Sequence, residues 1–585
     1  TTRGRVFGWP MLTGAALCAG LTGGLISPVW AAAPPDAGVS DVELGSFSLG
    51  DALEATIGEL DGSFGFALSA GGLRLGWDSR AVATDAAHLG HGWSFGLATV
   101  RVNGGVWVMP PSGGAFQMDA TAPSGLAGYP RADVSFAAAE PGATLPARAD
   151  GSLGEVSYAY VLHELGGIST YFDAAGHPLA KVVVDGDRVD WRWEAGATGR
   201  LLAVVGVDGA ITALDWADPS RLVIAPGRNI TDPPPGSGAG GRWEVELEGA
   251  RVSAIVDPAG LRTRLVYSRA GLLERVTTPA GSSTHIHWQA WPDGVSRVDR
   301  VRSIDDVSGA EVSVRPWALQ GQVSPTGWPA AGDALATASE MLAYETSVSD
   351  GKTRSTTAVD AAGRVAAREL EVMASSGTRV IHDQAFGYPE DDDSAAVTAR
   401  GARPTSVTTT QHDRLGATRS DTESYEFDEF GRMTARTTTD GATIRRVYDD
   451  HVPAGHPLPI GLVLEETTTA HDGLVTSTRS ELDAARTAAV ATEEWSGRGD
   501  ELTRIARIER VVEQGMVTER RVFPAGDPAA VPIVTRWAKH VDLARGTRTV
   551  TETSAAGTAI ETTTAATTSL VHGGVLAQTD AVGNV

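Results

Sequence analysis

The chain is built mainly from short segments in which apolar and polar residues alternate, and glycine bounds most of these segments. A period of two is typical of β-strands that bury one face. Residues 261–267 and 272–278 are two such segments, and residues 98–108 have the pattern of a hairpin with an Asn-Gly turn. The pattern predicts an all-β protein made of many hairpins.

These strand segments recur at a regular interval. The glycines that bound them from residue 249 to residue 281 are spaced by 11, 11 and 10 residues, so turn, strand, turn and strand repeat with a period near 21. In the best-formed turns an Asp precedes a Gly by three residues. The carboxylate can accept bonds from nearby backbone N–H groups, and Gly can adopt the positive φ that closes the turn. Because each repeat buries its inner face only against its neighbours, the period predicts a wall of stacked hairpins.

We assign a structural role in the turns, and no catalytic role, to a set of residues that share these positions. They are Asp173, Gly176, Asp257, Gly260, Tyr267, Gly271, Gly281, Asp360, Gly363, Asp428, Gly431, Gly441, Asp580 and Gly583.

Units of the form Tyr/Phe-Asp-x-x-Gly-Arg-Leu/Val, followed by Asp-Gly, resemble the Tyr-Asp (YD) repeats of one family. That family comprises Rhs proteins, wall-associated polymorphic toxins, insecticidal toxin-complex C components and teneurins. Residues 73–80 and 89–94 are similar to the segment that precedes the repeats in bacterial Rhs chains. The resemblance covers residues 65–585, and it is dense at 165–290 and 420–450.

The resemblance implies a spiralling β-sheet shell that surrounds and delivers a C-terminal effector toxin lying beyond residue 585. Two repeats depart from the pattern: Trp193-Glu194 stands where Tyr-Asp is expected, and the segment 482–486 has lost its glycine. The C-terminal Rhs core motif has no convincing copy here. Since the chain stops one residue into the strand that should follow the turn at 580–583, we expect the wall to be truncated at its C-terminus.

The chain divides into six predicted parts. Arg3, Arg5 and an uncharged apolar stretch that ends at Ala31 have the pattern of a signal peptide, so we expect a protein that is secreted or associated with the cell wall. The expected parts are a signal peptide (1–31), an acidic linker with a short helix at 53–60 (32–64), a β-rich N-terminal domain (65–165), YD repeats (166–289), an insertion or irregular segment with a helix near 334–344 (290–345) and degenerate YD repeats (346–585).

Composition excludes several classes of partner and site. The formal net charge of −24 disfavours nucleic-acid binding by the bulk of the surface. Cys18, the only cysteine, lies in the signal segment, so the mature chain has neither a disulfide nor a thiolate zinc site. No later segment is long and apolar enough to predict a membrane span. We expect no cofactor and no metal.

Several motifs that could carry chemistry have a simpler interpretation. Residues 92–96 spell the G-x-S-x-G nucleophile elbow around Ser94, but no βα pattern surrounds them. The pair His88/His91 would need a helix to share one face, and the local glycine content argues against a helix. The pair His285/His287 would share a strand face but has no evident third zinc ligand. Residues 391–393 (Asp-Asp-Asp) and the glycine-rich loop 233–241 lack the calcium and phosphate spacings. The sequence therefore predicts no catalytic residue.

Two other functions stay open at this stage. A cell-surface adhesion module, similar to teneurins, would bind glycans or cell-wall polymer through exposed tryptophans of residues 65–165. The third hypothesis is a polysaccharide-active β-solenoid enzyme. The scaffold hypothesis differs from both because its main partner is an effector on the same protein.

Overall fold

A computed structural model describes residues 43–582 with gaps, of which the longest are 80–88, 227–241, 321–343 and 389–402. Every element of the described residues is a β-strand, so the predicted all-β class is confirmed. No described segment forms a helix able to cross a bilayer. The predicted signal peptide, His88, His91, Asp360, Gly363, residues 391–393 and Gly583 lie outside the described residues.

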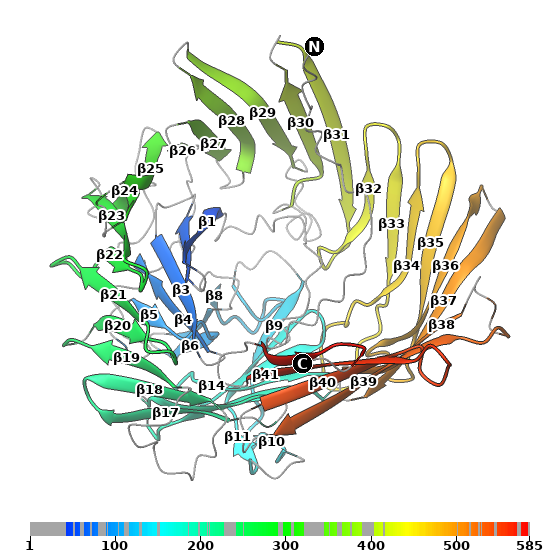
Figure 1. The fold of residues 1–585 in the computed structure, drawn as a ribbon, viewed down its shortest axis with the longest axis horizontal. Coiled ribbons are helices and arrows are strands. Elements are labelled where there is room, and N and C mark those ends of the chain that lie inside the picture. Colours follow the sequence, from blue (N-terminus) through cyan, green and yellow to red (C-terminus); the bar gives the residue numbers. More distant parts are fainter. Residues whose placement is uncertain are drawn as a thin grey trace.

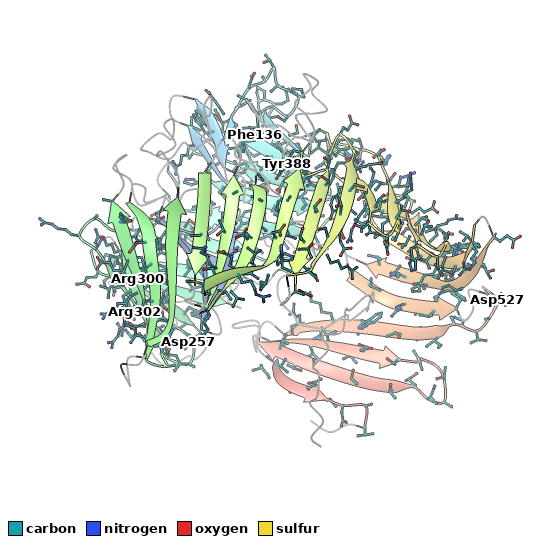
Figure 2. The ribbon with its side chains drawn as sticks, turned by 90° about the horizontal axis from the view of Figure 1, so that it is seen from above. Phe136, Asp257, Arg300, Arg302, Tyr388 and Asp527 are labelled. Atoms are coloured by element: carbon teal, nitrogen blue, oxygen red, sulfur yellow. The ribbon has the colours of Figure 1, made fainter. Side chains whose placement is uncertain are left out.

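Most strands belong to one continuous antiparallel sheet, which we call the wall. Its strands pair in sequence order from β12 to β42, and β9 pairs with β12 at the start. Figure 1 shows the wall curving around a central space, and Figure 2 shows the green, yellow and orange strands following one another along a curved ramp. The first strands are β9 (Val134–Ala138), β12 (Tyr160–Glu164), β13 (Ile168–Phe172), β14 (Pro178–Val183), β15 (Arg188–Trp193), β16 (Leu201–Val205), β17 (Ile211–Asp218), β18 (Arg221–Pro226), β19 (Trp243–Leu247), β20 (Val252–Val256), β21 (Arg262–Tyr267), β22 (Leu273–Thr277), β23 (Ser282–Ala290), β24 (Ser296–Asp305) and β25 (Glu311–Gln320).

The wall then continues without a change of strand order. Its later strands are β26 (Tyr344–Ser349), β27 (Thr353–Val359), β28 (Val365–Ala374), β29 (Gly377–Gly387), β30 (Ser406–His412), β31 (Thr418–Phe427), β32 (Met433–Thr437), β33 (Thr443–Tyr448), β34 (Val463–Thr469), β35 (Leu474–Leu482), β36 (Ala489–Arg498), β37 (Glu501–Glu513), β38 (Met516–Phe523), β39 (Ile533–Asp542), β40 (Thr547–Ser554), β41 (Thr562–Ser569) and β42 (Val575–Thr579).

Three small sheets are separate from the wall. The largest, which we call the inner sheet, lies inside the curve of the wall in Figure 1. It contains β1 (Glu43–Gly50), β2 (Leu53–Gly58), β3 (Phe64–Ala70), β4 (Leu73–Asp78) and β5 (Trp93–Ser94). The other two contain β6 (Thr99–Val102), β7 (Val106–Met109) and β8 (Phe116–Gln117), and β10 (Thr144–Leu145) with β11 (Val156–Ser157).

The wall's turns share one hydrogen-bond pattern. In the turn after β20, Gly260 N donates to Asp257 O at 2.9 Å and Asp257 N donates to Leu261 O at 3.0 Å. The Asp257 carboxylate accepts from the backbone N–H groups of Ala259 (2.9 Å) and Leu261 (2.8 Å). Asp428 makes the same contacts in its own turn. The turn glycines have φ between 74° and 93°: Gly176, Gly260, Gly271, Gly281, Gly431 and Gly441.

Two expectations about secondary structure are wrong. Residues 53–58 form strand β2 instead of a helix, because they pair with β1 and β3 along their whole length. The supposed irregular segment contains β24 and β25, which continue the wall by antiparallel pairing. A register shift at His287/Trp288 places the buried residues Val298 and Val301 three positions apart. The alternation of buried and exposed residues is therefore interrupted in the sequence of this strand. Residues 334–343 lie outside the described residues, and Tyr344 begins β26.

Two turn glycines with the same conformation offer a matched test of close packing. A Cβ on Gly176 would lie 1.9 Å from Val100 O of β6, whereas a Cβ on Gly260 would have nothing within 4 Å. We expect Gly260→Ala to cost about 1 kcal/mol through its positive φ. Gly176→Ala should cost a further ~1–3 kcal/mol, because the β6 backbone must move. Urea unfolding of both variants measures the difference, and equal costs would contradict the close approach of β6.

Candidate functional site: the inner face of the wall

The inner sheet packs on the concave side of the wall through one apolar cluster. From the N-terminal part, the cluster takes Leu73, Leu75 and Trp77 of β4 together with Trp93 and Phe95. Burial of such side chains is the main favourable term that holds two sheets together. The wall contributes buried residues from β16 to β24: Leu201, Leu214, Leu222, Ile224, Val245, Val252, Ile255, Leu265, Leu273, Val276, Ile286, Val298 and Val301.

Aromatic residues lie at the centre of this contact. Trp77 is 1% exposed, and its ring centroid lies 6.4 Å from that of Tyr267 and 6.3 Å from that of Trp288. Trp93 Nε1 donates a 2.9 Å hydrogen bond to the Tyr267 hydroxyl, although 174 residues separate the two. Burial raises the pKa of the Tyr267 hydroxyl well above its usual range, so this phenol stays neutral. Tyr267, predicted as a turn residue, therefore also binds the inner sheet.

These contacts contradict the expectation of exposed tryptophans in residues 65–165. Trp77 and Trp93 are buried, and Trp107 is half-buried. A glycan would have no access to the first two rings in this arrangement. A large aromatic side chain in a β-rich segment is more often part of a core than a binding platform.

A second set of aromatic residues forms a ladder along the turns, which sequence reasoning missed. Trp193 Nε1 donates to Pro178 O at 2.7 Å, and Trp216, Trp288 and Tyr448 each donate at 2.8 Å to the carbonyl 15 residues earlier. Each acceptor is the second residue after a turn glycine. In the longer hairpin of β28 and β29, Tyr388 donates to Val365 O at 2.9 Å. The signal in the sequence is this fixed offset from the glycine to a Trp or Tyr.

In three of the four regular cases the residue that directly follows the turn glycine covers the ladder ring. Arg432 lies 4.5 Å from the Tyr448 ring centroid, and Arg200 lies 5.3 Å from that of Trp216. His177 stacks on Trp193 at 4.7 Å. A cation over an aromatic face is attractive, so the Gly-Arg pair of the motif stabilises both the turn and the ladder.

An offset of 160 residues superimposes two stretches of the wall and reveals a change on its inner face. The turn glycines Gly271 and Gly281 correspond to Gly431 and Gly441, and the ladder residue Trp288 corresponds to Tyr448. The inward residues differ: where β22 and β23 have Val276 and Ile286, β32 and β33 have Arg436 and Arg446.

Carboxylates accompany both of these arginines. Arg436 Nε donates to Glu423 Oε2 at 3.1 Å, and Arg446 Nε donates to Glu466 Oε2 at 2.7 Å. Glu423 stands where β21 has Thr263. The turn chemistry is therefore constant, while the inner face changes from apolar beside the inner sheet to ion-paired farther along the wall. Ion pairs suit a surface in contact with water or with a polar occupant better than they suit a dry core.

The repeat that lacks a glycine has a compensating ion pair. Arg486 takes the glycine position with φ of 58°, a conformation that is strained for a residue with a Cβ. Its guanidinium holds Asp449, the acid of the preceding repeat, with Nε to Oδ2 at 2.9 Å. Asp449 is 3% exposed, and the hydrogen bond from Arg486 lowers the pKa of its carboxyl. The arginine that replaces the glycine in the segment 482–486 thus links two repeats.

A loop after β33 joins distant parts of the wall, in a contact that we call the seam. His456 is buried, and its Nε2 lies 3.2 Å from Ile168 O of β13. Its ring meets that of His163 edge-on, with centroids 4.8 Å apart. Burial, aided by His456, lowers the pKa of His163 to about 4. The seam therefore holds His163 in an environment that disfavours its protonated form.

The remaining predicted residues do not come together into a chemical site. Asp173 binds the backbone of its own turn and His177, while Asp580 accepts from Val582 N at 3.0 Å. Ser94 is exposed and lies on the two-residue strand β5. His285 and His287 lie on β23. Among the described residues, no group of three or more His, Cys, Asp or Glu could hold a metal ion.

Comparison with known proteins gives only distant structural likeness. No protein-family model and no curated protein sequence matches the chain. It is similar to a TcdB2–TccC3 crystal structure, at 11% identity and a TM-score of 0.31, over 80% of this chain and 25% of that one. The Photorhabdus luminescens Tc holotoxin pore gives 11% identity and a TM-score of 0.25, over 91% of this chain and 29% of the other.

A porin-like protein from Bacteroides uniformis matches at 10% identity and a TM-score of 0.18, over 38% of this chain and 91% of that one. The chain spans about a quarter of the length of the toxin-complex chains that it matches. Because these values are too low to assign a function, function is inferred below from the residues of this chain.

The ion pair in the glycine-less turn predicts an unusual response to restoring the motif. Arg486→Gly relieves the backbone conformation but leaves the buried Asp449 carboxylate without its guanidinium. We expect a lower urea midpoint at pH 7, and recovery in the double variant Arg486→Gly/Asp449→Asn. A single variant as stable as the parent protein would show that the ion pair does no more than offset the cost of the positive φ at Arg486.

The seam predicts loss of stability in acid. The folded pKa of His163 is about 4, against an ordinary value of 6.5, so the unfolded chain binds its proton first as the pH falls. This contribution is present above pH 6.5 and is lost between about pH 6.5 and pH 4. Hydrogen exchange of residues 451–462 should accelerate in that window, after correction for intrinsic rates.

His163→Phe keeps a ring at this position but cannot titrate, so it should abolish the acid response of the seam. His287→Gln, a change of an exposed histidine on β23, is the matched control and should retain the response. An unchanged acid response in His163→Phe would assign it to other groups.

Proposed function

We propose that this chain is a secreted structural scaffold, a section of an Rhs/YD-repeat shell that encloses and delivers a C-terminal effector. The chain itself performs no catalysis in this proposal, and any reaction belongs to the effector. The effector is its main partner, and the apolar signal segment at residues 1–31 directs its export. The sequence resemblance at 165–290 and 420–450 supplies the family to which the proposal refers.

One observation carries the proposal: the wall keeps its turns and ladder while its inner face changes character. In β21–β23 that face is apolar and is covered by the inner sheet. At the equivalent positions of β31–β33 it carries Arg436, Arg446 and Glu423. A sheet selected only to pack against a core would keep apolar residues at these positions. A wall that covers a core in one part and borders an enclosed space in another requires this change.

Adhesion to glycans or to the cell wall is the competing function. Its support in the sequence is a set of tryptophans expected to be exposed, and the burial of Trp77 and Trp93 weakens that support. Adhesion through other residues would place the recognition surface outside the inner face. The two functions therefore differ in whether the partner is enclosed or bound on the exterior.

Protease protection separates these functions. The product of the complete reading frame that contains this chain should be purified and treated with a nonspecific protease, with the isolated downstream segment as control. We expect the downstream segment to resist cleavage in the full product and to be degraded alone, and electron microscopy should show density inside the wall. Cleavage at equal rates, or binding of the chain to purified cell wall without any enclosed segment, would overturn the scaffold proposal in favour of adhesion.

A further inference from the structure

Two arginines of the wall face each other directly across neighbouring strands. Arg510 of β37 pairs with Arg520 of β38 in the antiparallel register, so their side chains leave the same face of the sheet side by side. Like charges directly opposite each other destabilise a sheet. Burial and the neighbouring Arg520 both lower the pKa of Arg510. The pair therefore needs a compensating partner.

Other arginines of these two strands and of the neighbouring strand β39 have such partners. Arg504 and Arg507 of β37 both bind Glu493, and Arg521 and Arg536 both bind Glu519. Among the described residues, no carboxylate contacts Arg510 or Arg520 within ion-pair distance. The Arg510/Arg520 pair is thus a local excess of positive charge in a chain whose net charge is −24.

The surroundings of the pair form a small polar site on an apolar base. Arg510 donates one hydrogen bond, from its terminal nitrogen to Thr492 Oγ1 of β36 at 2.6 Å. Arg520 Nε is buried and has no hydrogen-bond partner. Ile508, which is 5% exposed, pairs with Thr492 on one side and Val522 on the other. A buried guanidinium N–H without an acceptor is costly, and an added acceptor would remove that cost.

We propose that Arg510 and Arg520 form a binding site for a small oxyanion group, a carboxylate or a phosphate. An oxyanion between the two guanidiniums accepts charge-assisted hydrogen bonds from both, including the bond that Arg520 Nε otherwise lacks. It also neutralises the repulsion between the two cations. Thr492 and the apolar residues Ile508 and Val522 fix the position of the arginines and reduce the competition of water for their N–H groups.

The proposed site predicts that stability responds differently to the loss of an arginine when no anion is present and when one is bound. Without an anion, removing one of the two positive charges relieves repulsion, so Arg510→Gln and Arg520→Gln should have urea midpoints equal to or above that of the parent chain. With inorganic phosphate at constant ionic strength, the parent chain should gain stability in a saturable way, since a ligand that binds only the folded state stabilises it.

Both variants should lose this phosphate response, with apparent affinity reduced about tenfold or more, because each guanidinium supplies charge-assisted bonds. Arg536→Gln is the matched control: it removes an arginine that is already paired with Glu519, so it should lower the midpoint and keep the response to phosphate. Exclusion of phosphate from protein surfaces also stabilises, but that effect is not saturable and is shared by all variants.

A parallel titration with acetate identifies the source of the group. A saturable response to acetate alone assigns the site to carboxylates, such as acidic side chains of a partner, and a response to phosphate alone assigns it to phosphate esters. Either result, or both, supports the site when Arg510→Gln and Arg520→Gln abolish the response. The absence of any saturable response in the parent chain, or an unchanged response in both variants, overturns it. The scaffold function does not depend on this outcome, because it is tested by enclosure.

Discussion

The fold depends on how the chain satisfies a backbone carbonyl after the turns at Gly176, Gly199, Gly271 and Gly431. The strand that leaves such a turn begins with a register shift: Leu273 pairs with Tyr267 and Met433 with Phe427, and the next residue of each strand has no partner, which interrupts the regular ladder of hydrogen bonds. A buried carbonyl without a donor would be costly. A Trp or Tyr side chain from the next hairpin supplies the donor, 15 residues later in the four regular cases. Turn, strand length and aromatic position are therefore fixed together.

These hydrogen bonds at the wall's edge leave the residues of the inner face free to differ between repeats. The turns and the ladder hold neighbouring hairpins at the wall's edge, so the middle of each strand does not have to supply the same contacts in every repeat. Beside the inner sheet the middle positions are apolar, as at Val276, and farther along they carry ion pairs, as at Arg436. The same constraint explains why a turn can lose its glycine at Arg486, provided that the side chain makes a new link to Asp449.

Sequence reasoning found the strands and the best turns because both are local. An Asp three residues before a Gly favours one turn geometry, and the structure gives Asp257 and Asp428 the same hydrogen bonds. The inner sheet was missed because its partners are distant: Trp93 and Tyr267 are separated by 174 residues, and nothing near either residue indicates the other. The seam between His163 and His456 was missed for the same reason. The short segment at 53–58 was wrongly predicted as a helix because its strand conformation depends on pairing with β1 and β3.

Tyr267 shows that the same position of the repeat can bind either the wall or the inner sheet. Like Tyr448 and Trp288, it ends or nearly ends an odd-numbered strand at the edge where the ladder runs. Those two residues donate to a wall carbonyl, whereas the Tyr267 hydroxyl accepts a hydrogen bond from Trp93 of the inner sheet. A hydroxyl can both donate and accept, but an indole can only donate. Tyrosine at this position therefore allows the repeat to bind a donor from inside the wall. At the equivalent position, offset by 160 residues, Phe427 has no hydroxyl. An arginine covers the ring in both repeats, Arg251 at 5.8 Å from the Tyr267 centroid and Arg403 at 5.4 Å from that of Phe427. At this one repeat position Trp288 and Tyr448 thus bond to a carbonyl of the wall, Tyr267 bonds to the inner sheet, and the ring of Phe427 can do neither.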